Sequence, residues 1–214
     1  MLGLQQLTRM LELDRSNLVL EACAKAGGPL PISIRLQFES SGSLRSSAVA
    51  FALKRMTDLS YRITPPIEHA SELLLEHQLE DGSFSNDDCP AVTIAAVSAL
   101  SAVLDLTDRA GGTLTPALAR LAERVSTALG HAIDSLRSTR AMTHDGLLGD
   151  TQTTAYLLLA IARSTRLQEK IDPAELSGTL RDAGALHDRH AAALLAHAER
   201  LLGTGHCFAA STAA

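Results

Sequence analysis

The sequence predicts an all-α fold of stacked helical hairpins that form a partial α/α toroid. Apolar residues recur every three or four positions along most of the 214 residues, which is the spacing of one helix face. A glycine turn followed by a helix of small residues occurs several times. The helices before these turns carry charges along one face, whereas those after them are small and apolar. This contrast is typical of outer and inner helices in a double-layered repeat fold.

The repeated turn identifies the units of the fold. It reads Gly42-Ser43-Leu44, Asp81-Gly82-Ser83-Phe84 and Asp145-Gly146-Leu147-Leu148, and a fourth copy begins at Gly205. Helices of small residues follow at 46–53, 93–100 and 153–160. One helix pair cannot bury its apolar face alone, so such units stack on one another. We therefore expect a single domain over 1–214, with units at about 1–60, 61–110, 114–165 and 172–214.

The first quarter of the chain contains one element that does not match the helical pattern. Leucines at helical spacing over residues 4–20 predict one or two short helices, which end at a Gly/Pro cluster over 26–31. Residues 32–38 then alternate apolar and polar side chains, which predicts a strand or an extended connector.

The remaining elements are all predicted to be helices. Prolines near the first turn predict helix starts, because the missing N–H is not needed there. Glycines such as Gly203 predict helix ends. The expected helices span 46–57, 67–79, 91–105, 116–138 and 151–165, then a short one from Pro173 to near Gly184, and a last one over 187–202.

Composition excludes several classes of function. The net charge is −5 without a long basic run, so we expect no nucleic-acid partner. Apolar stretches fall short of the ~20 residues that span a bilayer, and the N-terminus has no basic segment before an apolar block. We therefore expect a cytoplasmic protein with no membrane span. The three cysteines, Cys23, Cys89 and Cys207, are too few and too scattered for a disulfide framework.

Two segments resemble the repeat of the prenyltransferase and squalene-cyclase superfamily. Residues 75–84, Leu-Glu-His-Gln-Leu-Glu-Asp-Gly-Ser-Phe, are followed after a gap by Thr-Ile-Ala-Ala-Val-Ser-Ala-Leu over 93–100, and residues 145–160 look like a second copy. In that superfamily a Gln and an Asp-Gly-aromatic turn link an outer helix to an inner helix rich in Thr and Ala. The resemblance covers about 65–164 and implies the α/α toroid.

The resemblance also implies a candidate acid. Class II terpene cyclases carry Asp-x-Asp-Asp-Thr-Ala, and the matching stretch is Ser85-Asn86-Asp87-Asp88-Cys89-Pro90. It keeps the last two carboxylates, whereas Ser85 replaces the first and Cys89-Pro90 replaces Thr-Ala. Asp87 is thus implied as the proton donor to an alkene or epoxide, with Asp88 raising its pKa. The alternative is that residues 86–88 cap the helix that begins near Pro90.

No metal or other cofactor is expected. Asp87-Asp88-Cys89 has the first spacing of the zinc site in protein prenyltransferases, but the later His would fall near Thr153 and is absent. A tetrahedral zinc site needs all its ligands in place. His187, Asp188 and His190 are an alternative ligand set, although a solvated helix start accounts for them as well.

Two functions from different classes follow. The first is a terpene-cyclase-like protein that binds or cyclises an isoprenoid-type hydrophobic substrate by acid-initiated chemistry. Its substrate would contact Phe84, Thr93, Thr153 and Tyr156 in a small apolar cavity. Only six aromatic residues are present and no Trp, which disfavours it, because cyclases steer carbocations with aromatic faces. The alternative is a non-catalytic helical scaffold that binds a protein partner, a companion subunit or a second copy of itself.

Overall fold

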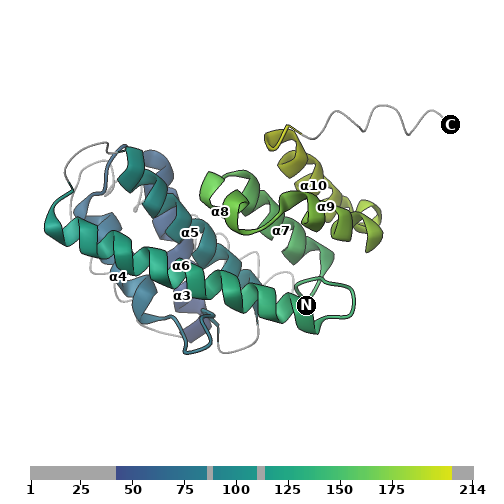
Figure 1. The fold of residues 1–214 in the computed structure, drawn as a ribbon, viewed down its shortest axis with the longest axis horizontal. Coiled ribbons are helices and arrows are strands. Elements are labelled where there is room, and N and C mark those ends of the chain that lie inside the picture. The colour runs from purple at the N-terminus through teal and green to yellow at the C-terminus, as the bar shows by residue number, and fades with distance from the viewer. Residues whose placement is uncertain (1–41, 86–88, 110–113, 204–214) are drawn as a thin grey trace.

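The computed structural model of this chain describes residues 42–85, 89–109 and 114–203. Within these ranges every regular element is a helix (Figure 1), which confirms the all-α prediction. The helices are α3 (Gly42–Leu59), α4 (Pro65–Glu76), α5 (Pro90–Arg109), α6 (Pro116–Met142), α7 (Thr151–Ala162), α8 (Thr165–Lys170), α9 (Pro173–Asp182), the short 3-10 helix η1 (Ala185–His187) and α10 (Arg189–Leu201).

The expected helices from residue 46 onward are present, with changed ends. The first begins at Gly42 rather than near residue 46, so Gly42-Ser43-Leu44, which the sequence predicts as the first copy of the turn, is helical instead. The helix expected over 151–165 ends at Ala162, because Ser164 is extended and its carbonyl accepts the first hydrogen bonds of α8. The helices expected over 4–20, the strand or connector over 32–38 and the fourth turn at Gly205 lie outside the described residues.

Apart from the short α8 and η1, successive helices alternate between two rows. One row consists of α3, α5, α7 and α10, each of which packs against the next. The other consists of α4, α6 and α9. Arg124 on α6 pairs with Glu72 on α4, at 3.5 Å. Arg140, also on α6, donates to Glu175 and Thr179 on α9, at 2.8 and 3.1 Å. Chain order therefore runs from one row to the other and back, as stacked helical hairpins require.

The core lies between the two rows. Helix α5 is buried on nearly all sides, whereas α6 buries a single stripe that includes Leu121, Val125 and Leu129. This agrees with the predicted contrast between small apolar helices and amphipathic ones. Helix α5 is also long and apolar enough to cross a membrane, but 78% of its most apolar stretch is buried in the protein. Such burial is what a core helix of this composition needs.

The turns over residues 81–84 and 145–148 have the same hydrogen-bond pattern. The Asp81 carboxylate accepts from the Ser83 N–H at 2.9 Å, and the Asp145 carboxylate accepts from the Leu147 N–H at 3.0 Å. A threonine of the following helix then accepts from the buried end of each turn. Thr93 accepts from Phe84 N–H at 3.1 Å, and Thr154 accepts from Leu148 N–H at 2.8 Å. The apolar residue of each turn is thereby held in the core.

Gln78 connects the turn over residues 81–84 to the neighbouring helix α6. Its side-chain amide donates to the carbonyl of Gly82 at 3.0 Å and to that of Ala128 on α6 at 2.8 Å. Gly82 has φ +85°, and a Cβ there would lie 2.4 Å from the carbonyl oxygen of His131. Glycine is therefore required by both the backbone conformation and the close approach of α6.

Candidate functional site

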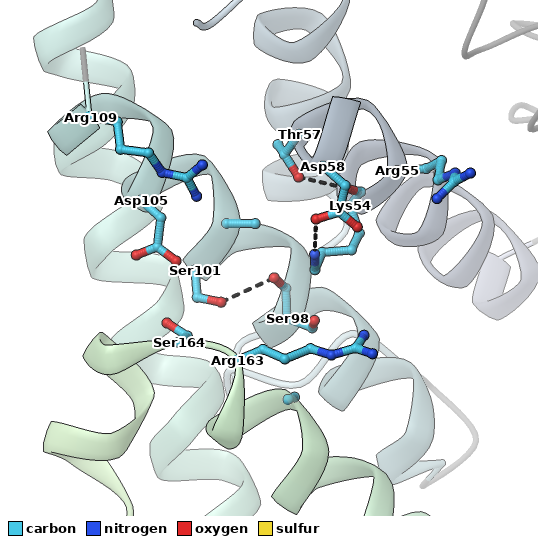
Figure 2. A pocket seen from close by; sticks show the side chains of 12 residues that line it. Lys54, Arg55, Thr57, Asp58, Ser98, Ser101, Asp105, Arg109, Arg163 and Ser164 are labelled. Carbon is cyan, nitrogen blue, oxygen red and sulfur yellow. Dashed lines mark hydrogen bonds and ion pairs between the residues drawn. The ribbon is translucent and has the colours of Figure 1, made fainter. Parts of the chain in front are cut away.

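A polar cleft of about 450 Å³ opens where the C-terminal parts of α3, α5 and α7 meet (Figure 2). All three helices belong to the same row. Ala102 and Ala160 are the apolar members of its lining, and the other ten residues carry polar or charged side chains. These ten are Lys54, Arg55, Thr57, Asp58, Ser98, Ser101, Asp105, Arg109, Arg163 and Ser164.

The cleft lining has more cationic side chains than carboxylates, and not every cation has a carboxylate partner. Four cationic side chains face two carboxylates. Asp58 pairs with Lys54 one helical turn away, and Asp105 lies 3.8 Å from Arg166, a residue of α8 beside the cleft. Within the described part of the chain, Arg109 and Arg163 form no hydrogen bond or ion pair with a side chain or carbonyl. Both carboxylates thus have a cation close by, and two guanidinium groups are left available.

Part of this positive charge has a structural role. Helix C-termini carry partial negative charge, and cations near them are stabilising. Arg109 is the last residue of α5, and Arg163 follows the last residue of α7. This effect explains why cations occur here, but among the described residues it supplies no acceptor for the N–H donors of either guanidinium. In Figure 2 Arg163 extends below Ser98, and Lys54 and Asp58 on α3 face Asp105 and Ser101 on α5.

Three buried hydroxyl groups line the cleft. Thr57, Ser101 and Ser164 are 3%, 2% and 4% exposed. Thr57 and Ser101 each donate to a carbonyl one turn earlier in their own helix. The Ser164 Oγ has no hydrogen-bond partner among the described residues. Ser164 precedes α8 in the N-cap position, yet its side chain does not cap that helix.

The unpartnered Ser164 hydroxyl is the strongest sign that the cleft binds something. A buried polar atom without a partner costs roughly 1–3 kcal/mol of stability. Native structures keep few such atoms, and each calls for an explanation. A ligand with a polar group near Ser164 would supply the missing hydrogen bond.

Asp105 is the half-buried carboxylate of the site. Burial raises the pKa of its carboxyl group above the ordinary value of 3.8, although Arg166 and Arg109 both act to lower it. The carboxyl group is therefore easier to protonate than an exposed aspartate. Perturbed carboxyl groups in clefts are more frequent at functional sites than elsewhere.

The residues predicted from the sequence lie apart from this cleft. Asp87 and Asp88 are outside the described residues, and their predicted role stays a prediction. Phe84 is 1% exposed in the core, and Thr93, at 2%, accepts its N–H. Thr153 is half-buried at the start of α7, where its N–H donates to Asp150. Thr154, rather than Thr153, matches Thr93 by its hydrogen bond. The second copy is therefore offset by one residue from the expected correspondence of 93–100 with 153–160.

Tyr156 is the predicted residue closest to the cleft along the chain. It is 37% exposed on α7 and lies one helical turn before Ala160, which lines the cleft. Burial raises the pKa of its phenol, and the positive charge of Arg163 acts in the opposite direction. Spacings of four and seven residues place Tyr156, Ala160 and Arg163 on one helix face.

Sequence reasoning missed the cleft itself. One signal was present, because Ser98, Ser101 and Asp105 interrupt an otherwise apolar helix at spacings of three and four. These spacings put three polar residues on one face of a buried helix. The pairing of Asp58 and Asp105 with cations, and the lack of partners for Arg109 and Arg163, depend on tertiary contacts.

No protein-family profile, curated protein or solved structure matches this chain.

Proposed function

We propose that this protein binds a small anionic molecule in the cleft between the C-terminal parts of α3, α5 and α7. The observation that carries the proposal is the Ser164 hydroxyl, which has no partner among the described residues, in a cleft where two guanidinium groups likewise have none. Guanidinium groups bind carboxylate and phosphate oxygens in a bidentate manner. Arg109 and Arg163 attract the anion from the two sides of the cleft on which Figure 2 shows them, and Ser164 contributes a neutral hydrogen bond.

The form of the cleft agrees with this function. Its volume of about 450 Å³ lies in the range of roughly 300–1,000 Å³ that is usual for small-molecule sites. Its charged and polar lining suits an anion better than the hydrophobic substrate expected from the sequence.

The test is calorimetric titration with inorganic phosphate at low salt. Arg163→Ala and Arg109→Ala should each weaken binding at least about tenfold, because a hydrogen bond to a charged group contributes ~1.5–3 kcal/mol. Arg120→Ala is the matched control, because Arg120 is exposed on α6 and lies outside the cleft lining. The proposal fails if the wild-type chain does not bind phosphate, or if the three variants bind it equally.

A second proposal retains the predicted architecture and chemistry. The two rows would be a segment of an α/α toroid, and Asp87, supported by Asp88, would protonate an isoprenoid. What supports it is the shared hydrogen bonding of the two turns, because that repeat carries the resemblance. Turnover of squalene or geranylgeranyl diphosphate should vanish in Asp87→Asn and persist in Asp134→Asn, an exposed control on α6. Absence of turnover in the wild-type chain would refute it.

A further inference from the structure

The cleft has hydrogen-bond acceptors as well as cations. A hydroxyl group has one proton to donate and two lone pairs that accept. Thr57 donates its proton to the carbonyl of Lys54 at 2.7 Å, and Ser101 donates to that of Ser98 at 3.0 Å. Both side chains are therefore left with acceptor capacity alone. The ionised carboxylates of Asp58 and Asp105 are acceptors by nature.

A simple inorganic anion does not use these acceptors. It brings many acceptors of its own and few protons, so it satisfies Arg109 and Arg163 and leaves the hydroxyl and carboxylate oxygens of the lining without donors. Thr57 and Ser101 are too well buried for bulk water to serve them freely. A complementary ligand carries O–H or N–H donors in addition to its negative charge.

The charge of the cleft favours hydroxyl groups over ammonium groups as the donors of the ligand. An ammonium group would enter a cleft with four cationic side chains, and each of the two carboxylates already has a cation close by. The interior of a partly buried site strengthens that repulsion. Neutral hydroxyl groups carry no such cost, and Ala102 and Ala160 offer little surface to an aliphatic chain.

We propose that the ligand of this cleft is a phosphorylated polyol of about the size of a sugar phosphate. The inference rests on the proposed anion-binding function and adds the class of ligand. The phosphate lies between Arg109 and Arg163. The ligand hydroxyl groups donate to Thr57, Ser101 and the Asp105 carboxylate, and one of them pairs with Ser164.

The test compares ligands on the wild-type chain, so that it does not depend on how a variant folds. Calorimetry measures the affinity for glucose 6-phosphate, mannose 6-phosphate, ribose 5-phosphate, n-hexyl phosphate, inorganic phosphate and glucose. At least one sugar phosphate should bind ten times more tightly than n-hexyl phosphate, which has the same charge and no hydroxyl groups. Glucose should bind more weakly than any of the phosphates.

Variants then show which side chains cause the higher affinity for the sugar phosphate. Thr57→Val and Ser101→Ala should each remove most of the preference for the sugar phosphate over n-hexyl phosphate, while the affinity for n-hexyl phosphate stays within twofold. Arg163→Ala should weaken both ligands alike. Thr127→Val, on the exposed face of α6, should change neither affinity, and circular dichroism verifies that each variant is folded.

The outcomes separate this inference from the proposed function. If n-hexyl phosphate and inorganic phosphate bind as well as every sugar phosphate, the polyol proposal is wrong and anion binding stands. If no phosphate binds at all, both proposals are wrong. A preference for the sugar phosphate that survives both Thr57→Val and Ser101→Ala would also overturn the assignment.

Discussion

At the scale of single residues, Gly82 has the least room for a side chain among the described glycines. Its φ of +85° disfavours any side chain, and a Cβ would collide with the His131 carbonyl at 2.4 Å. Gly149 provides a matched control, because its φ is +83° but no atom lies within 4 Å of the position of its Cβ.

Gly82→Ala should therefore destabilise the protein more than Gly149→Ala. The left-handed conformation alone costs about 1–2 kcal/mol, and the forced contact adds ~1–3 kcal/mol. Urea denaturation of both variants measures the difference. Equal losses of unfolding free energy in the two variants would mean that the turn over residues 81–84 does not approach α6 as described.

Asp105 sets the expected pH dependence at the same scale. Its pKa is raised above 3.8 by burial. As the pH falls through this raised pKa, the carboxylate is protonated and the cleft loses a negative charge. Anion affinity should therefore increase on acidification, by on the order of tenfold, because a nearby negative charge that repels the anion is removed. Sulfate is the suitable probe, because it stays fully ionised over this range.

Asp105→Asn identifies the group responsible. The variant should bind sulfate more tightly than the wild-type chain at neutral pH, and the rise on acidification should disappear. Lys54, Arg109, Arg166 and Asp108 are the charged groups that act on Asp105. A rise that persists in Asp105→Asn would assign the pH dependence to another residue.

At the scale of elements, a threonine in the first turn of α5 and of α7 holds the preceding loop. Thr93→Val keeps the shape of the side chain and leaves the buried Phe84 N–H without its acceptor. It should reduce the free energy of unfolding by about 1–3 kcal/mol. Thr127→Val on exposed α6 should change it by less than ~0.5 kcal/mol. Thermal and urea denaturation compare the two, and equal effects would contradict the role given to the turn.

The sequence predicted the existence of these elements better than their ends. Helical spacing and proline positions located helices α3 to α7, α9 and α10, because periodic apolar faces are a strong signal. The end of α7 at Ala162 and the register of Thr154 against Thr93 were not predicted. Both depend on which backbone groups find partners, as Ser164 does when its carbonyl begins α8.

At the scale of the whole molecule, the alternation of two rows follows from the repeated turn. The cleft cannot be derived from that repeat. Its lining comes from three helices that are about fifty residues apart in sequence, so no local pattern brings Lys54, Asp105 and Arg163 together. The stripe of Ser98, Ser101 and Asp105 marked one wall. The opposite wall and the unpaired guanidinium groups arise only when α3, α5 and α7 pack in one row.

Hydrogen–deuterium exchange of the wild-type chain with and without saturating phosphate tests the central claim most directly. An anion held by α3, α5 and α7 should slow exchange in the segments 54–58, 98–109 and 160–164, because ligand binding suppresses local opening. Arg163→Ala should lose this protection at the same phosphate concentration. Unchanged exchange in all three segments, or protection confined to other helices, would contradict the account.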